Sequence, residues 1–525
     1  MDRPPLITAL LSPACYPHAC SKIELIETHI SWVILTGKYA YKIKKPLNLG
    51  FLNFASLDKR HHYCKEELRL NQRLAPQLYI DVVAIYYNGP QLSIVEAHPE
   101  AVEFAVRMHQ FSQQQMLTSC LHRHTIETRH IKQLAYDIAH FHLTHNQQQN
   151  NPHHGNINSP LHAIEDNFHH LTQCLPNIDL NQLHQDLHEK CQSLRPLMTQ
   201  RLQQGFVREC HGDMHLGNMV MLDDHITLFD CIEFNPDFFW IDVMSDIAFL
   251  LMDLQHRNYP EWANQLLNHY LSKTGDYAGL PLLSLYQSYR AMVRAKVTAI
   301  LLQQHNNPEE QYTALESVNA YLKLAQQFIR PSRGALIITH GLSGSGKSYL
   351  CQQLSPQLNA IHLRSDVERK RIFSINPEIE THTALSQQHY SPQAKQVVYR
   401  HLLAISSLLI EHGFTVLVDA TFIDHEPRDH FQQLAADKGC PFIILQLDAP
   451  SQQLRHNIHQ RQRHSLDPSD ADLSVLRKQQ QHYQSLPAEC SSLIQHHWGD
   501  EIKQTLHAIR QKLSNHSKQI ELQGR

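Results

Sequence analysis

The residues best suited to chemistry are 341–348, which read GLSGSGKS and follow the apolar run 335–339. A strand, then G-x-x-x-x-G-K-[ST], then a helix is the sequence form of a loop that cradles nucleotide phosphates. The glycines allow backbone turns that bring N–H groups onto phosphate oxygens, while the lysine supplies a mobile charge and the final serine a magnesium-binding hydroxyl. The predicted nucleotide-contacting residues are Gly341, Gly344, Ser345, Gly346, Lys347 and Ser348.

Three polar side chains later in the chain fit the same site. AIHLRSDVERKRI, 360–372, predicts a short strand and a helix, and we assign Asp366 as the base that accepts a substrate hydroxyl proton, or else as the N-cap of that helix. FTVLVDATF, 414–422, predicts a buried parallel strand that presents Asp419 to magnesium. Arg461, after the strand at 441–450, is expected in a lid over the phosphates, with an exposed helical arginine as the alternative.

A second constellation lies in the first half of the chain. HGDMHLGN, 211–218, is followed by ITLFD, 226–230. In protein kinases the spacing H-x-D-x-x-x-x-N with a later strand-end Asp performs phosphoryl transfer. Asp213 would then orient the attacking hydroxyl and accept its proton, while Asn218 and Asp230 would hold magnesium.

A lysine and a glutamate upstream complete this pattern. Tyr39-Ala40-Tyr41-Lys42 has the form of the kinase strand whose lysine binds phosphates. Lys44 lies two residues on, on the same face of the strand, and is the alternative phosphate-binding lysine. A further alternative is that both lysines are solvated and bind no phosphate. Glu67 or Glu66, on a helix predicted over 62–76, would pair with that lysine. The segment 103–108 is expected to be the hinge that offers backbone groups to adenine.

Composition limits the remaining possibilities. The chain has 525 residues, 42% of them hydrophobic, with no apolar run near the roughly 20 residues of a membrane span, so we expect a soluble cytoplasmic protein with no membrane partner. A net charge of −4 provides no general field for nucleic acid. The 11 cysteines indicate reduced thiols, and the 41 histidines are interpreted as surface residues spread among Gln and Asn rather than set at metal spacing.

The elements that must position these residues divide into two domains. Strands are predicted over 23–45 and 78–96 around the 62–76 helix, and mostly helical patterns follow from 111, interrupted by a polar stretch at 145–160 that we interpret as an exposed loop. Residues 331–334 break the periodicity. The prediction is an α+β kinase-like domain over 1–330, with a small lobe at about 20–110 and a helical lobe at about 111–330, and an α/β P-loop domain with a parallel sheet over 335–525.

With these motifs in place, residues 1 to about 330 resemble the aminoglycoside phosphotransferase-like family, and 335–525 resembles P-loop kinases of the zeta-toxin-like kind. The whole chain resembles bacterial fusions of the two. The resemblance implies ATP and Mg²⁺ in both halves, a substrate-binding insertion in the helices before His211, and a bracing role for Asp242 and Asp246, whose alternative role is helix capping. The glycine-rich loop expected between the first two kinase strands is absent, because that turn reads ETHIS.

The hypothesis that follows is an ATP-dependent kinase with two active sites, each transferring a γ-phosphoryl group to a hydroxyl of an unidentified small molecule. One alternative makes the N-terminal domain a non-catalytic nucleotide-binding regulator, with the P-loop domain alone acting as a kinase. Another makes the P-loop domain a polynucleotide 5′-kinase, in which case the acceptor is a nucleic acid end.

Overall fold

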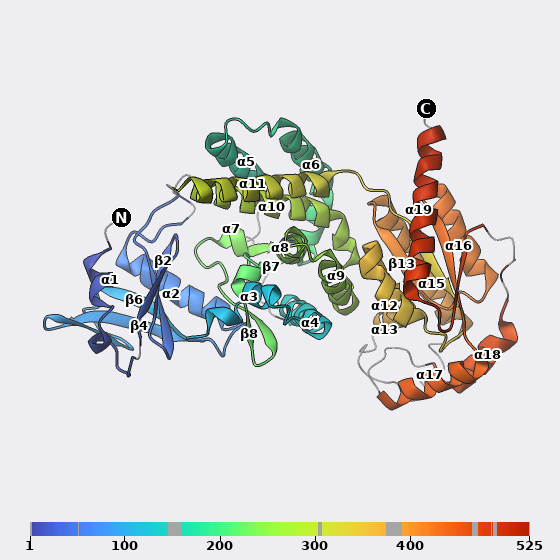
Figure 1. Cartoon of the computed structure of the whole chain (residues 1–525), viewed down its shortest axis with the longest axis horizontal. Helices are drawn as coiled ribbons and strands as arrows, with labels where there is room; N and C mark the ends of the chain where they lie inside the picture. Colours follow the sequence, from blue (N-terminus) through green and yellow to red (C-terminus); the bar gives the residue numbers. More distant parts are fainter. Residues whose placement is uncertain are drawn as a thin grey trace. The chain divides into compact units, whose positions relative to one another are not determined.

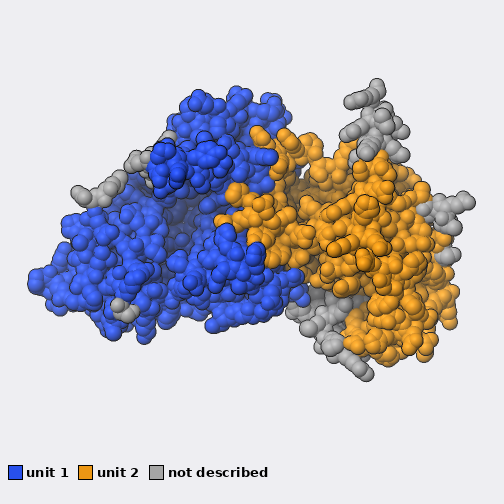
Figure 2. Space-filling model, viewed as in Figure 1, with its two compact units in different colours: residues 1–253, 285–325 blue, residues 254–284, 326–525 orange. Residues whose placement is uncertain are grey.

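The structure is a computed structural model that describes residues 3–20, 22–50, 52–144, 159–302, 307–373, 391–464, 471–484, 486 and 491–523. The polar stretch predicted as a loop lies almost entirely outside these residues. The chain forms two compact units: unit 1 comprises residues 1–253 and 285–325, and unit 2 comprises 254–284 and 326–525 (Figure 2). Among the described helices, none carries an apolar stretch long enough to cross a bilayer.

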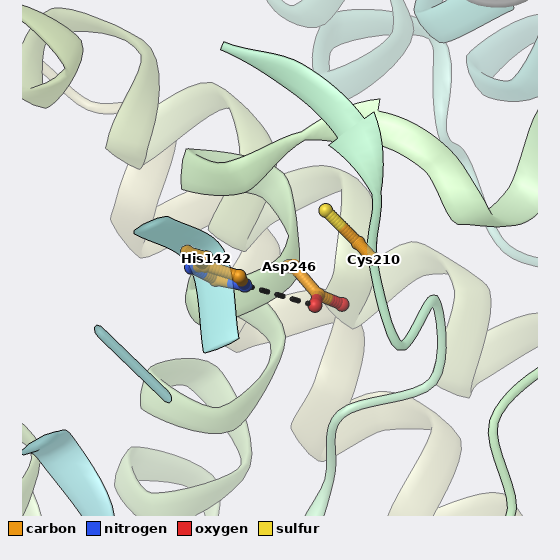
Figure 3. Close-up of side chains that lie close together, drawn as sticks. All are labelled: His142, Cys210 and Asp246. Atoms are coloured by element: carbon orange, nitrogen blue, oxygen red, sulfur yellow. Dashed lines mark hydrogen bonds and ion pairs between the residues drawn. The ribbon is translucent and has the colours of Figure 1, made fainter. Parts of the chain in front are cut away.

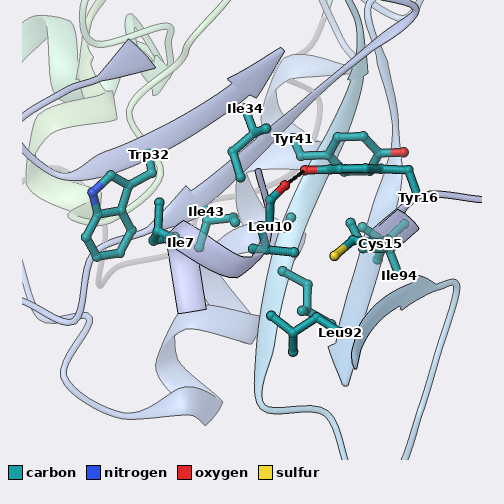
Figure 4. Packing of buried hydrophobic residues seen from close by; sticks show 13 residues of the cluster. Ile7, Leu10, Cys15, Tyr16, Trp32, Ile34, Tyr41, Ile43, Leu92 and Ile94 are labelled. Atoms are coloured by element: carbon teal, nitrogen blue, oxygen red, sulfur yellow. Dashed lines mark hydrogen bonds between the residues drawn. The ribbon is translucent and has the colours of Figure 1, made fainter. Parts of the chain in front are cut away.

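Unit 1 begins with an antiparallel sheet of six strands, which matches the predicted small lobe (Figure 1). In sheet order the strands are β1 (Glu24–Glu27), β2 (Ser31–Leu35), β3 (Tyr39–Lys44), β6 (Glu103–His109), β4 (Tyr79–Asn88) and β5 (Gln91–Val95). The short helix α1 (Pro5–Ala9) contributes Ile7 to the core on one face, against Trp32, Ile34 and Tyr41 (Figure 4). Alternation of apolar side chains along each strand thus gives the sheet two buried faces.

Helix α2 (Leu57–Asn71) covers the other face of this sheet, where Cys64 packs with Val106 and Met108. The predicted bounds of 62–76 were wrong by about five residues at each end. Ser56 accepts a hydrogen bond from Lys59 N (3.3 Å) and so caps the helix before the apolar periodicity becomes visible. The predicted glutamate positions nevertheless stay on this helix.

The rest of unit 1 is mostly helical. The segment 211–218, which holds the predicted catalytic residues and is here called the catalytic segment, lies between β7 and β8; β7 pairs with the distant β10, and β8 forms a hairpin with β9. The elements are α3 (Leu117–His122), α4 (Thr128–Thr144), α5 (Ser159–Cys174), α6 (Asn181–Gln203), β7 (Val207–Glu209), β8 (Met219–Leu222), β9 (His225–Leu228), α7 (Pro236–Phe239), β10 (Trp240–Asp242), α8 (Val243–His256), α10 (Leu283–Leu302) and α11 (Pro308–Ile329).

Unit 2 is built on a five-stranded parallel sheet, as predicted for the second domain. In sheet order the strands are β12 (Ala360–Arg364), β13 (Thr415–Asp419), β11 (Leu336–His340), β14 (Phe442–Asp448) and β15 (Leu493–His497). The helices are α9 (Pro260–Thr274), α12 (Lys347–Leu358), α13 (Ser365–Ile372), α15 (Pro392–Glu411), α16 (His425–Asp437), α17 (Ser451–His464), α18 (Leu473–His482) and α19 (Ile502–Gln523). The P-loop and Asp419 follow or end neighbouring strands at the carboxyl edge, where open α/β sheets bind ligands.

Candidate active sites

Two lysines of β3 meet one glutamate of α2 in unit 1. Lys42 Nζ lies 2.8 Å from Glu67 Oε1, and Lys44 Nζ lies 2.7 Å from Glu67 Oε2. Period-two alternation places both lysines on the same face of the strand, as the sequence predicted. Glu66, the alternative partner, pairs with Arg69 instead at 2.8 Å.

The surroundings distinguish the two lysines. Lys42 also contacts Asp230 Oδ1 at 2.5 Å, and 12% of its side chain is exposed. Lys44 is buried and pairs with Glu233, a buried acid that sequence reasoning missed because no motif includes it. Lys42 therefore keeps some exposure to solvent beside Asp230, whereas Lys44 is held inside the domain.

Charge pairing overrides burial in this cluster. Burial raises the pKa of Glu67, but the attraction of Lys42 and Lys44 is larger in sum and lowers it to about 2. Burial likewise opposes the charged form of Lys42, and Asp230 and Glu67 more than offset this and raise its pKa. The group is thus held as charged lysines around an ionised glutamate.

The catalytic segment brings Asp213 and Asn218 together. Asn218 Nδ2 donates to Asp213 Oδ2 (2.8 Å) and to the Asp213 carbonyl (3.0 Å), and His215 Nε2 lies 3.3 Å from the same carboxylate oxygen. Burial opposes the charge on Asp213, but His215 outweighs it and holds the pKa of Asp213 well below its usual range. The carboxylate is therefore ionised at neutral pH and can accept a proton.

The backbone of this segment is fixed from α8. Asp246 accepts hydrogen bonds from His211 N (3.0 Å) and Gly212 N (2.9 Å), and its carboxylate also contacts His142 Nε2 at 3.2 Å (Figure 3). Asp242 instead caps a helix, which was the alternative role for Asp242 and Asp246. It accepts a hydrogen bond from Met244 N at the start of α8 (2.8 Å) and pairs with Arg201. Asp246 is thus the residue that braces the catalytic segment.

Asp230 follows β9 in an unusual backbone conformation. Its φ of 63° lies in the left-handed region, which few residues other than glycine adopt. Asp230 N donates to Tyr79 Oη (3.2 Å), and Cys231 N donates to Asn71 Oδ1 (2.9 Å), so β4 and α2 hold the turn. Strain of this kind, overdetermined by neighbours, is common at functional sites.

The expected hinge was placed wrongly. Residues 103–108 belong to β6, whose backbone pairs with β3 on one side and β4 on the other, so it has no groups left for adenine. The ETHIS turn is closed by its own residues, because Thr28 N donates to Ser31 O (2.9 Å) and Ser31 N to Thr28 Oγ1 (3.0 Å).

The P-loop of unit 2 has the backbone conformation that its glycines predict. Gly344 and Gly346 have φ of 85° and 91°, and a Cβ on Gly344 would lie 2.6 Å from the Leu454 carbonyl oxygen. Lys347 Nζ donates to the Leu342 carbonyl (2.7 Å). Its burial lowers the pKa of Lys347 to about 8. The lysine thus folds back over the loop that would receive phosphates.

Helix α17 packs directly on this loop. Leu454 and Ile458 form a buried cluster with Leu476 of α18, and Asn457 Nδ2 donates to the Gly344 carbonyl (2.8 Å). Asn457 therefore ties α17 to the backbone of the loop. Arg461, one turn further on, donates to the Ala471 carbonyl and contributes to the electrostatics of Lys347.

Asp419 and Asp366 lie at the same end of the sheet. Burial opposes the charge on Asp419, but His362, whose Nε2 lies 3.3 Å from Asp419 Oδ2, outweighs it together with Arg364 and Ser348, and the pKa of Asp419 falls to about 2. Asp366 accepts from Arg369 Nη1 (2.6 Å) in the first turn of α13. That helix has Arg364 at its N-cap position with no side-chain capping bond, so neither Ser365 nor Asp366 is its N-cap.

Two family models match the chain. Residues 59–283 match the family model described as "Phosphotransferase enzyme family", and residues 336–486 match that described as "AAA domain". The chain therefore carries a phosphotransferase-family domain of the kinase fold followed by a P-loop kinase domain, and it is a kinase.

The chain is similar to uncharacterized proteins of Mycobacterium tuberculosis and Mycobacterium bovis, which are 26% identical over 431 residues, or 81% of this chain and 84% of the relative. Among solved structures, an ethanolamine kinase of Plasmodium vivax covers 58% of this chain and 84% of its own, with a TM-score of 0.37 and 12% identity. An APS kinase of Mycobacterium tuberculosis covers 35% and 99%, with a TM-score of 0.26 and 21% identity.

Proposed function

We propose that this kinase has two active sites, each of which transfers the γ-phosphoryl group of ATP to a hydroxyl of a small molecule. The observation that carries the proposal is the convergence of Lys42, Glu67 and Asp230 in one unit and of Lys347, Ser348 and Asp419 in the other. Each set pairs a phosphate-binding lysine with an acid suited to magnesium.

The donor atoms fit Mg²⁺, which prefers hard oxygen ligands. Asn218 and Asp230 would hold it in the kinase-like domain, where the Asn218 amide nitrogen faces Asp213 and its carbonyl oxygen is directed elsewhere. Ser348 and Asp419, which lie close enough to interact, would hold it in the P-loop domain. Bound there, the ion neutralises charge on the phosphate oxygens.

The residues of the chain account for the remaining steps. Lys42 and Lys347 bind phosphate oxygens, and Gly341, Gly344, Ser345 and Gly346 direct backbone N–H groups at them. Asp213 and Asp366 each accept the proton of the acceptor hydroxyl as its oxygen bonds to phosphorus and ADP leaves. Arg461 adds positive charge near the transferred group.

A cavity beside the catalytic segment supports a small acceptor in the kinase-like domain. Its volume is about 70 Å³, and Trp240, Tyr286, Tyr289 and Arg290 are among the residues that line it. Arg290 Nη1 donates to the Gly212 carbonyl (3.0 Å), directly before Asp213 in the chain. The acceptor is therefore expected to insert an apolar or aromatic group here.

The test assays Asp213→Asn and Lys347→Ala separately for ADP release and for transfer of labelled phosphate to pools of metabolites, aminoglycosides, nucleosides and oligonucleotides. Each variant is expected to lose one set of products and keep the other. If Lys347→Ala abolishes all transfer while Asp213→Asn has no effect, the kinase-like domain is a nucleotide-binding regulator. Label found only on oligonucleotide ends would instead identify a polynucleotide kinase.

A further inference from the structure

A cluster of metal-binding side chains lies on helices α5 and α6 of unit 1. Glu165 of α5 faces His184 and His188 of α6, with His184 Nε2 2.8 Å from Glu165 Oε2 and His188 Nδ1 3.0 Å from Glu165 Oε1. One potential ligand atom from each residue lies within 4.8 Å of the others. The histidines are four residues apart on one helix, so they share a face.

The geometry needs little change to accept an ion. Zinc bonds to nitrogen and oxygen of about 2.0–2.2 Å imply donor–donor distances of roughly 3.3 Å in a tetrahedral site. Each histidine nitrogen faces a different oxygen of the Glu165 carboxylate, at 2.8 and 3.0 Å, and both of these distances would open by a few tenths of an ångström around an ion. Phe168, buried and one turn along α5 from Glu165, packs against the His184 ring at 4.4 Å between centroids. This contact restricts the orientation of the imidazole.

The cluster is accessible to solvent and has donor atoms suited to a metal ion. The three side chains are 40–46% exposed, so an ion can enter from solvent. The carboxylate and the two imidazole rings supply the oxygen and nitrogen donors that zinc binds.

Two other groups of potential metal ligands occur among the described residues, and both are mostly buried and already take part in the two candidate active sites. His142, Cys210 and Asp246 are buried, and Asp246 already binds the backbone of the catalytic segment. Cys351, His362 and Asp419 belong to the P-loop site, and burial raises the pKa of the Cys351 thiol far above its usual range.

We propose that Glu165, His184 and His188 form a binding site for a divalent transition-metal ion such as Zn²⁺, with water at the remaining position. The site clips α5 to α6 and does not hydrolyse bonds, because Gln185 occupies the position after the first histidine where zinc hydrolases have a glutamate base. From the sequence, the histidines were interpreted as surface residues that are not spaced for metal binding. That interpretation did not consider His184 and His188, which are four residues apart on one helix. A second helix supplies the third ligand, which no local spacing reveals.

The test measures Zn²⁺ binding to the full chain by competition with a chromophoric chelator, and Co²⁺ binding by its visible absorption. The variants His184→Gln, His188→Gln and Glu165→Gln are compared with His170→Gln, a matched change at a histidine of α5 outside the cluster. Wild type and His170→Gln are expected to bind one ion tightly. Losing a ligand should cost more than the 10- to 100-fold typical of residues behind the ligands, so we expect His188→Gln to bind at least about 100-fold more weakly.

Thermal unfolding supplies a second readout. Zn²⁺ should raise the Tm of wild type and His170→Gln, and should have little effect on the three ligand variants. Equal affinities in His188→Gln, Glu165→Gln and wild type would overturn the proposal, as would the absence of a one-to-one site in wild type. These results are independent of phosphate transfer, so they leave the proposed function untouched.

Discussion

At the scale of residues, Lys42 and Lys44 separate two roles that their sequence context does not. Lys42→Met should leave the domain folded and abolish phosphate transfer by the kinase-like site, since it removes the lysine that faces Asp230. Lys44→Met should instead destabilise the domain by about 3–5 kcal/mol, because it leaves Glu233 buried without its cation and Glu67 with Lys42 alone. Denaturant unfolding and ADP release measured on both variants check the assignment; lost transfer in a stably folded Lys44→Met would reverse it.

Asp246 gives a prediction about pH at the same scale. Burial alone would raise its pKa, but His142 and the backbone N–H groups of the catalytic segment lower it below 3.8. An acid with a lowered folded-state pKa stabilises the fold above its unfolded pKa, and that contribution disappears as the pH falls through the folded value. Asp246→Asn should therefore lower the free energy of unfolding at pH 7 by about 2–4 kcal/mol and flatten its decline below pH 4. An unchanged acid limb would contradict this.

At the scale of elements, the sequence predicted those strands and loops that have a short repeat of apolar residues or a fixed motif. The strands around Lys42 and the P-loop before Lys347 were predicted correctly because alternation and glycine spacing are local. The start of α2 was missed because the residues after its cap, Ser56, read LDKRHH and show no apolar periodicity. Glu233 and the Asn457 contact with Gly344 were missed because they depend on long-range packing.

The packing of α17 on the P-loop also yields a prediction. Gly344→Ala should place a Cβ 2.6 Å from the Leu454 carbonyl in a left-handed conformation, so the loop or α17 must move. We expect a loss of about 1–3 kcal/mol in stability and a marked loss of ATP affinity in the P-loop domain. Gly439→Ala is the control, since its φ of 61° is equally strained and its Cβ would meet nothing within 4 Å. Equal ATP affinity in the two variants would show that the steric contact is unimportant.

At the scale of the whole molecule, the family-matched regions and the compact units do not coincide. Residues 254–283 lie inside the phosphotransferase match, yet they group with the P-loop unit. Asn268 of α9 covers the outer edge of β12, donating to the Ala360 carbonyl (2.9 Å) and accepting from His362 N (2.7 Å). Tyr277 donates to the buried Glu368 of α13 (3.1 Å). We propose that residues 331–334 are the linker between the two domains.

These contacts predict that residues 331–525 are not an independent folding unit. Without α9, the edge of β12 loses its partners and exposes backbone groups that promote aggregation. The isolated fragment should therefore have a lower Tm than the P-loop transition of the full chain, and weaker ATP binding. Within the full chain, Asn268→Ala should cost about 1–3 kcal/mol because it leaves His362 N without its acceptor, whereas Glu261→Ala, an exposed change on the same helix, should cost little. Calorimetry on both variants and the fragment decides the matter: a fragment as stable as the full chain would show that α9 is dispensable to the P-loop domain.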